Sequence, residues 1–540
     1  MKCFLFSLAL LHALPTVSRA HFLWLLTEPG ENSGRVHVYF GEAAEPDDPD
    51  LLDRVTKAQV WSVGRRGEPQ LLSLEKGDDS LTTELAGSAS QNTLILKHSY
   101  GVLTRGDASF VLNYYAKTYP FVLPGTWHEV DDAERLPLEI TPTRDGRSTV
   151  LHVTWQGSPA PNCEVVIAGP GLEERLEGTT DEAGAFRCSL PEAGAYSIRA
   201  RLVQNKSGEQ DGKAYDSVRH YSTLTLRNAP SQFVCESQKL PELPQGITSF
   251  GGAIAGDTVF AYGGNYGSAH HYTNEEQSND LWSLDLSTEK AEWKKLAGGP
   301  RLQGLAMVEH DGLLYRVGGF TALNSEDEDQ NLQSQATVAR FNPQTRKWEE
   351  LPSLPEPRSS LDAAVVGDVL YVAGGWNMPG GEEERVWHRT AWALDLSADE
   401  LAWQPIATQP FTRRALALAA WKGKLFCIGG MREEGGPSTE VDVYDPATNS
   451  WAKGPAILGT SLDGFGSSAF ACQGRLFVST ISGSLQRLSA EGDRWEFVGQ
   501  LDHPRFFHRL LPWQDSKLVA IGGGNMEVGK VTEVDVISVK

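Results

Sequence analysis

Six basic side chains in the C-terminal half have the chemistry of an anion-binding site. They lie in or near short links between successive copies of a repeat: Arg301, Arg358, Arg413, Arg414, Arg505 and His508. Guanidinium groups bind carboxylates and sulfates through paired hydrogen bonds, so several of them around one opening would favour an acidic ligand. The alternative is that each arginine braces its own loop by bonding backbone carbonyl groups. The sequence leaves both interpretations open.

A second candidate site is the histidine that would begin the chain after export. Residues 1–20 have the features of a signal peptide, with a basic start, an apolar run too short to span a bilayer, and small residues at Ser18 and Ala20. Cleavage after Ala20 would expose His21, which offers an α-amine and an imidazole nitrogen to one ion. Copper or nickel suits such ligands, and His37, His98 or His220 could complete the site. The alternative is that His21 simply begins a strand.

Two long loops carry further candidates. His270, His271 and Glu275 could bind a metal, and His388 beside Trp387 could stack on a sugar. The plainer interpretation is that each is a solvated loop residue.

The composition indicates an acidic, globular protein of several domains. Its 540 residues exceed one core, and 54 Gly, 29 Pro and 15 Trp suit short strands joined by many turns. The net charge of −22 repels phosphate backbones, which argues against a nucleic-acid partner. Beyond residue 20, no apolar run reaches the length of a membrane span.

Internal repetition is the strongest signal in the chain. A short apolar run closed by two glycines occurs at Gly263, Gly264, Gly318, Gly319, Gly374, Gly375, Gly429, Gly430, Gly522 and Gly523. A sixth copy carries Thr480 and Ile481 instead. Five of the copies continue to a single tryptophan: Trp293, Trp348, Trp403, Trp451 and Trp495. A four-stranded sheet cannot cover its own apolar faces, so the copies are expected to stack in a closed ring.

These motifs resemble the kelch family of β-propellers over residues 229–540. The resemblance implies an all-β fold with a six-bladed propeller, in which the fifth blade departs from the glycine pattern. The last copy has no strand after residues 534–539, whereas residues 233–241 are similar to the end of a blade. The outer strand of the last blade is therefore expected to come from the N-terminal side and to close the ring.

Some kelch-like rings are enzymes, including a copper radical oxidase and proteins that resemble a sialic acid epimerase. The oxidase needs a Tyr–Cys cross-link and paired histidines, which the surroundings of Cys427 and Cys472 do not offer. An epimerase needs an acid–base pair, for which His508, Arg505 and Asp463 are candidates that no pattern singles out.

Short alternating strands in residues 21–143 predict a β-sandwich. Residues 21–226 are similar to an uncharacterised periplasmic family related to accessory components of nickel and cobalt uptake. Residues 144–228 resemble a carboxypeptidase-regulatory-like β-sandwich, on the turn from Thr180 to Phe186 and the later Gly194 and Tyr196. Such modules act as stalks or adaptors.

The cysteines do not form a disulfide framework. Cys163, Cys188, Cys235, Cys427 and Cys472 show no zinc spacing, although Cys163 and Cys188 could pair. The leading prediction is an exported, non-catalytic binding protein, secreted or periplasmic, whose propeller recognises a protein or glycan. Metal binding at His21 and a carbohydrate-active enzyme are the alternatives.

Overall fold

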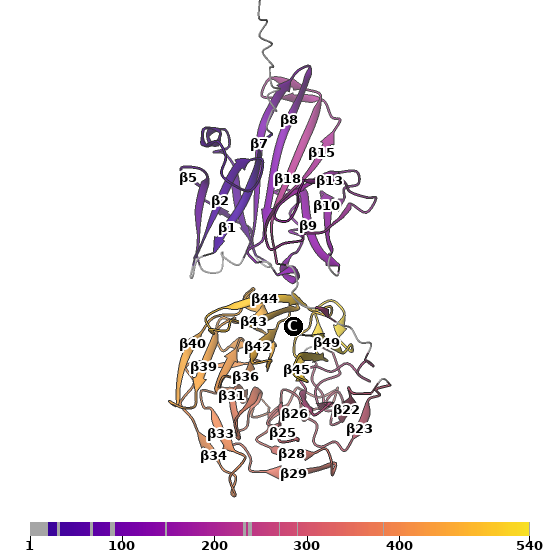
Figure 1. Cartoon of the computed structure of the whole chain (residues 1–540), viewed down its shortest axis with the longest axis vertical. Helices are drawn as coiled ribbons and strands as arrows, with labels where there is room; N and C mark the ends of the chain where they lie inside the picture. Colours follow the sequence, from indigo (N-terminus) through magenta and orange to yellow (C-terminus); the bar gives the residue numbers. More distant parts are fainter. Residues whose placement is uncertain are drawn as a thin grey trace, which may run out of the picture.

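Both halves of the chain are built from strands, which confirms the all-β prediction. The computed structural model describes residues 20–29, 33–64, 68–86, 92–121, 123–145, 148–229, 234–235, 240–268, 271–288, 290–381 and 383–538. Figure 1 shows stacked N-terminal sheets above a C-terminal ring. The predicted signal peptide lies outside the described residues except for Ala20. No helix in these ranges is long and apolar enough to cross a membrane.

A central eight-stranded sheet organises the N-terminal half. Its order is β13 (Leu176–Thr179), β12 (Glu164–Ala168), β15 (Gly194–Gln204), β18 (Ser217–Asn228), β8 (Ala108–Thr118), β7 (Thr93–Arg105), β3 (Gln59–Val63) and β4 (Gln70–Leu72). One face packs against β1 (Phe22–Pro29), β2 (Ser33–Gly41), β6 (Leu81–Ala86) and β5 (Glu75–Lys76). The other packs against β9 (Leu138–Asp145), β10 (Ser148–Trp155), β14 (Ala185–Cys188) and β11 (Ser158–Pro159). Smaller elements are η1 (Pro49–Arg54), η3 (Pro124–Thr126) and the hairpin of β16 (Gly208–Gln210) and β17 (Lys213–Tyr215).

The central sheet joins the two units expected from the sequence. β18 runs parallel to β8, with His220 beside Asn113, so strands of the second unit extend the sheet of the first. The expected boundary at residue 143 falls inside β9. The two units therefore share one continuous sheet.

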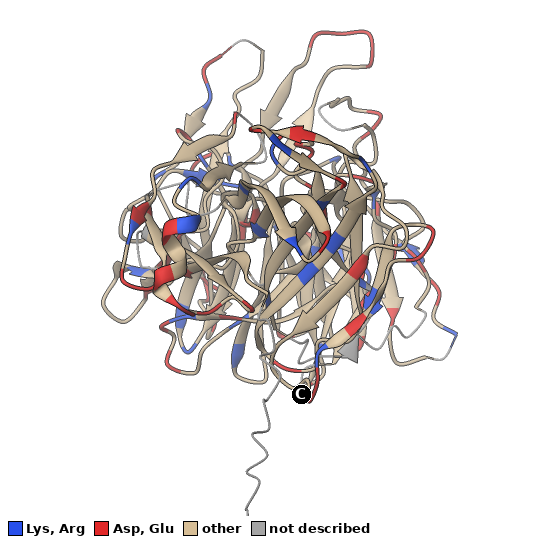
Figure 2. Ribbon diagram, turned by 90° about the horizontal axis from the view of Figure 1, so that it is seen from above, with Lys and Arg blue, Asp and Glu red and all other residues tan. Residues whose placement is uncertain are grey.

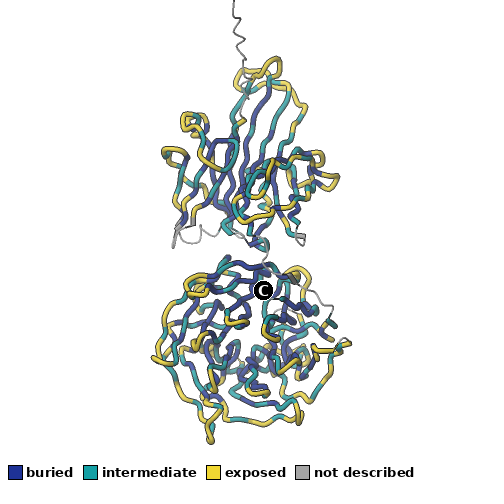
Figure 3. The backbone as a smooth tube through the Cα atoms, viewed as in Figure 1, coloured by how far each residue is buried: buried dark blue, intermediate teal, exposed yellow. Residues whose placement is uncertain are grey.

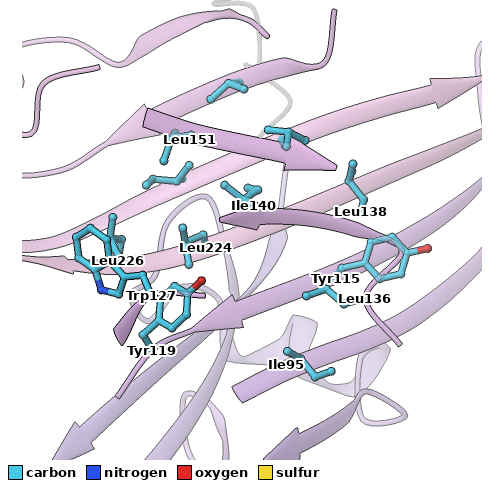
Figure 4. Close-up of a cluster of buried hydrophobic side chains, with 14 of the residues drawn as sticks. Ile95, Tyr115, Tyr119, Trp127, Leu136, Leu138, Ile140, Leu151, Leu224 and Leu226 are labelled. Atoms are coloured by element: carbon cyan, nitrogen blue, oxygen red, sulfur yellow. The ribbon is translucent and has the colours of Figure 1, made fainter. Parts of the chain in front are cut away.

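Alternation along the central strands creates two cores. In β7, Leu94 and Leu96 pack toward β1 and β2, whereas Ile95 packs toward β9 and β10. Tyr114 and Tyr115 divide in the same way, because successive side chains of a strand point to opposite faces. Figure 3 shows these buried strands between exposed margins, and Figure 4 shows the core on the β9 side.

Six main sheets follow one another around the ring in the described part of residues 234–538. The first sheet holds β20 (Gly251–Ala255), β21 (Thr258–Tyr262), β22 (Leu281–Asp285) and β23 (Lys294–Leu296), and the second holds β24 (Ala306–His310), β25 (Leu313–Val317), β28 (Val338–Asn342) and β29 (Lys347–Leu351). The third holds β30 (Ser359–Val366), β31 (Val369–Asn377), β33 (Trp392–Asp395) and β34 (Trp403–Pro405), and the fourth holds β36 (Ala417–Trp421), β37 (Lys424–Ile428), β39 (Val441–Asp445) and β40 (Ser450–Gly454). The fifth holds β41 (Ser468–Cys472), β42 (Arg475–Ser479), β43 (Ser484–Leu488) and β44 (Trp495–Gln500), and the sixth holds β45 (Arg509–Trp513), β46 (Lys517–Ile521), β49 (Asp535–Ser538) and β19 (Val234–Cys235). We number these blades one to six. Short loop elements are β26 (Phe320–Ala322), β27 (Leu332–Ser334), β32 (Val386–Trp387), β35 (Arg413–Arg414), β38 (Met431–Arg432), η4 (Ser461–Gly464), β47 (Gly524–Asn525) and β48 (Gly529–Lys530).

The ring closes as the sequence predicts. The innermost strands β20, β24, β30, β36, β41 and β45 each contact the next, and β45 contacts β20. The outer strand of blade six is β19, whose Val234 and Cys235 pair with Ser538 and Ile537 of β49. The N-terminal origin of this strand is thus confirmed.

The repeated glycines and tryptophans hold neighbouring blades together. Gly263 and Gly264 both have left-handed backbones, with φ of 68° and 93°. A Cβ atom on Gly263 would lie 2.5 Å from the carbonyl oxygen of Leu302, so the next blade leaves no room for a side chain. Each of the five repeat tryptophans donates its indole N–H to a backbone carbonyl at the end of the preceding blade. For Trp403 the acceptor is Pro352, at 2.8 Å.

Blade five differs where its glycines are replaced. Thr480 and Ser484 close a tight turn between β42 and β43, where most other blades have long loops. Gly125, in η3 of the N-terminal half, lies against Ser482 so closely that a Cβ atom would overlap the Ser482 carbonyl group. The N-terminal half therefore contacts the ring at this short turn.

Candidate ligand-binding site

A circle of backbone hydrogen bonds surrounds the ring axis. It links one residue near the start of each innermost strand: Ser249, Gly304, Ser360, Ala415, Gly466 and Phe507. The amide of each residue donates to the carbonyl of its counterpart in the preceding blade, over 2.6 to 3.2 Å. All six have left-handed φ angles between 51° and 62°. The circle fixes the six blades relative to one another where the mouth of the ring begins.

A pocket of about 400 Å³ lies at this circle. Its described lining carries basic groups and no carboxylate: Arg385, Arg414, Arg509 and His508, with Tyr272, Phe320, Trp376 and Phe507 as aromatic walls. Figure 2 shows acidic and basic residues interspersed over the chain as a whole. A basic lining in a chain of charge −22 favours an anionic ligand.

Arg509 closes the centre of the pocket. Its guanidinium reaches from blade six across the axis and bonds Oδ1 of Asp362 in blade three, at 2.9 Å. It also donates to the carbonyl groups of Phe250 and Leu305, in blades one and two. The positive charge of Arg509 is therefore largely satisfied within the ring.

Arg414 is a basic group of the lining that forms no ion pair with a described carboxylate, so it is available to a ligand. Its guanidinium lies 4.3 Å from the centre of the Trp376 ring, and Arg385 lies 5.0 Å from the same ring. Burial lowers the pKa of Arg414, an effect that Tyr272 opposes. The buried Nε has no hydrogen-bond partner among the described residues. A guanidinium held by an aromatic face and not by a carboxylate can bond an incoming anion.

His508 is a neutral hydrogen-bonding group at the pocket wall. Its Nε2 lies 2.6 Å from Oγ of Ser479, and its buried Nδ1 lacks a partner in the described structure. Burial lowers the pKa of His508 well below its usual value, and the charges of Arg505 and Arg509 lower it further. The imidazole is therefore uncharged at neutral pH.

Three of the predicted ligand arginines are buried in bracing positions. Arg358, Arg413 and Arg505 each bond the carbonyl group of the first glycine of their own blade's pair, at 2.9 to 3.1 Å. Arg413 and Arg505 also form ion pairs, with Asp442 and Asp535. This geometry matches the bracing alternative. Arg301 bonds the carbonyl of Gln277 and does not line the pocket.

Of the predicted ligand residues, the structure brings only Arg414 and His508 into the lining of the mouth pocket. The sequence reasoning missed Trp376, Arg385, Phe507 and Arg509. Trp376 directly follows a repeat glycine pair, and Arg509 directly follows His508, so proximity to these motifs was the available signal.

The other loop candidates have ordinary partners. His388 is buried with Nε2 at 3.0 Å from the Pro357 carbonyl, and burial followed by the Arg358 charge lowers its pKa to about 4. His271 pairs with Glu276 at 2.9 Å, whereas His270 lies outside the described residues. Asp463 accepts hydrogen bonds from the Thr460 amide and the Thr480 hydroxyl.

The four histidines considered for metal binding lie apart. His21 precedes β1, and His37 pairs with Leu26 in the middle of the hairpin, roughly 16 Å along the strands. His98 is near Tyr100 on one face of the central sheet, and His220 stacks on Tyr115 on the other. None of these four histidines belongs to a cluster of three described His, Cys, Asp or Glu side chains that lie close enough to share one ion.

Four of the cysteines are free thiols in the described structure. Cys163, Cys188, Cys427 and Cys472 form no disulfide in the described structure, so the pairing of Cys163 with Cys188 considered above is not made. Burial raises the pKa of Cys163 and of Cys188 to about 11, which leaves both protonated and unreactive.

Comparison with known proteins agrees with the geometry of the ring. Residues 301–355 and 412–456 match the kelch motif. The ring is a kelch β-propeller. A solved structure titled "Structure of YjhT" covers 56% of this chain and 97% of its own, at 20% identity and a TM-score of 0.45.

The curated relatives include both enzymes and other kelch proteins. An N-acetylneuraminate epimerase of Haemophilus influenzae is 27% identical over 51% of this chain and 66% of its own length. The kelch-like protein terF of Aspergillus terreus is 26% identical over 59% and 61%. Kelch-like protein 35 of Mus musculus is 26% identical over 45% and 37%. The chain spans less than two thirds of each of these relatives.

Proposed function

We propose that the propeller mouth of this protein binds a carboxylate-bearing sugar without transforming it. The observation that carries the proposal is Arg414, whose guanidinium stacks on Trp376 in a pocket whose described lining has no carboxylate. Arg414 would bond the carboxylate, and the Trp376 face would pack against the sugar ring. The similarity to N-acetylneuraminate epimerases supports a sugar acid as the ligand. We also propose that the protein is exported, on the signal-peptide features of residues 1–20.

Binding without catalysis is favoured by the state of the candidate acid–base groups. Arg505 is tied to Asp535 and to backbone carbonyls, and Asp463 is tied to Thr460 and Thr480. Neither residue lines the mouth pocket. His508 does line it, but no described carboxylate accompanies it there.

Calorimetric titration with N-acetylneuraminate, a hexuronate and a neutral hexose tests the proposal. Both acids should bind and the hexose should not. Arg414→Gln and Trp376→Leu should each weaken binding at least tenfold. Arg432→Gln is the matched control, because Arg432 bonds Gly435 and Gly436 on a nearby loop without lining the pocket. Equal binding of acid and neutral sugars would contradict the proposal, as would turnover of a bound acid in proton NMR spectra.

A protein ligand is the second candidate, because apolar side chains are exposed on the same face. Leu323, Val386, Met526 and Val528 are more than half exposed, and all lie on loops between the second and third strands of blades two, three and six. Kelch repeats are typical of protein-binding propellers. If this candidate holds, replacing Met526 and Val528 by serine should abolish partner capture and leave sugar titrations unchanged.

A further inference from the structure

The residue that would begin the exported chain lies at the edge of the N-terminal half, in a separate part of the molecule from the mouth. His21 directly precedes β1, and Ala20 before it is exposed. The peptide bond between them is the predicted signal-peptide cleavage site. Removal of residues 1–20 would place a new α-amine beside the His21 side chain.

Three contacts fix His21 in place. Its carbonyl oxygen accepts a hydrogen bond of 2.9 Å from the Tyr114 hydroxyl. The centre of its imidazole ring lies 5.6 Å from the centre of the Phe40 ring. The Nε2 atom lies 3.5 Å from Oδ2 of Asp47. The side chain is 20% exposed, so the ring is mostly buried and its orientation is set.

The contact with Asp47 divides the roles of the two ring nitrogens. A carboxylate beside Nε2 favours the tautomer in which Nε2 carries the hydrogen, and Nδ1 then keeps its lone pair. No described residue forms a hydrogen bond with Nδ1. In a chain that begins at His21, the α-amine and Nδ1 belong to the same residue and close a six-membered ring around one ion.

We propose that processing at Ala20 makes His21 a two-nitrogen chelator of divalent copper or nickel. The α-amine and Nδ1 bind the ion, displacing water from it, and any proton on the amine is released to solvent. Asp47, whose carboxylate oxygen lies 3.5 Å from Nε2, acts as a positioning residue, as carboxylates do behind many metal-bound histidines. Nitrogen ligands suit both metals. This site does not depend on the ligand proposed for the mouth.

The site is confined to His21 because the other histidines are held elsewhere. His37 bonds Ser80 and lies near Glu28, and His220 bonds Tyr115 and Gln204. The remaining positions around the ion are therefore open to water or to an external ligand.

Metal titration of processed protein tests the proposal. The exported chain is purified, its first residue is read by mass spectrometry, and Cu²⁺ or Ni²⁺ is added in a calorimeter. We expect His21 as the first residue, binding of one ion, and nitrogen splitting in the copper electron paramagnetic resonance spectrum. Asp47→Asn should keep this stoichiometry and weaken binding by about 10- to 100-fold.

Two matched variants separate the terminal site from adventitious binding. A chain that retains Ala20 has the same folded residues but an acylated His21 nitrogen, so it should lose at least tenfold in affinity. His37→Gln should bind as the wild type does. A first residue other than His21, no binding to the processed chain, or equal binding when Ala20 is retained would each overturn the proposal.

Discussion

Arg509 and Asp362 join opposite blades of the ring through an ion pair of 2.9 Å at the axis. Both side chains are largely buried, and Asp362 also accepts a hydrogen bond from the Leu418 amide in blade four. One interaction therefore involves three blades, and the backbone acceptors of Arg509 add blades one and two.

Breaking this pair should destabilise the ring. Asp362→Asn leaves the Arg509 charge buried without its counter-ion, at an expected cost of about 3 kcal/mol in the free energy of unfolding. Urea unfolding followed by tryptophan fluorescence measures the loss. The double variant Asp362→Asn with Arg509→Met should recover part of it, because no buried charge remains. A single variant that unfolds at the wild-type urea concentration would contradict the prediction.

The N-terminal half should lose stability in mild acid through His220. Burial lowers its pKa to about 4, below the value of about 6.5 for an exposed histidine. Below pH 6.5 the unfolded chain takes up a proton that the folded chain resists, so stability present above pH 6.5 is lost as the pH falls toward 4. The expected loss is about 3 kcal/mol. His220→Gln should show a shallower dependence of the free energy of unfolding on pH, measured by urea unfolding at a series of pH values. An unchanged pH dependence in this variant would contradict the prediction.

The hydrogen-bonded circle at the mouth should be stabilised by a glycine. Ala415 has a φ of 52°, a left-handed conformation that glycine adopts without steric cost. Ala415→Gly should therefore raise the free energy of unfolding by about 0.5 kcal/mol, after the entropy cost of a more flexible unfolded chain. The control is Ala417→Gly in β36, which removes a buried methyl group from an ordinary strand and should destabilise. Destabilisation by both changes would argue against strain at Ala415.

The indole N–H groups should contribute measurably to blade cohesion. Trp403→Phe keeps an aromatic ring but removes the 2.8 Å hydrogen bond to Pro352, leaving a carbonyl with one partner fewer. The expected loss is about 1 kcal/mol, measured as a lower Tm in calorimetry. Trp392→Phe serves as a comparison, since its indole lies 3.4 Å from Glu356, on the link that leads into its own blade. If both variants lowered the Tm equally, the hydrogen bond between blades would stabilise the ring no more than the one to Glu356.

The sequence predicted the ring because its motifs are local. The glycine pair recurs in five blades, and a tryptophan after the third strand also recurs in five, at similar spacing. Each feature makes the same kind of contact wherever it occurs. The circle at the mouth has no such signal, since its members include Ser360, Ala415 and Phe507, which share a backbone conformation and not a residue type. The glycine and tryptophan spacing therefore identified the blades but not the floor of the pocket.

The arginines show why the site was harder to predict. Arg413 and Arg414 are neighbours of the same type in β35, yet one bonds carbonyls within its blade and the other lines the pocket. Successive residues of a strand point to opposite sides, so only the placement of β35 decides which guanidinium faces the ligand. Trp376 lies near the end of β31, whereas Arg385 reaches the pocket from the following loop, whose path no repeat specifies.

Among the described residues, η3 of the N-terminal half contacts the short turn of blade five, and β19, the first described strand after that half, belongs to blade six. A single connection would let the two halves rotate relative to each other, whereas a connection together with a separate contact restricts that rotation. The two halves should therefore keep a fixed relative orientation, with the mouth facing a constant direction relative to His21. A surface or partner that binds one half would therefore also orient the ligand bound to the other half.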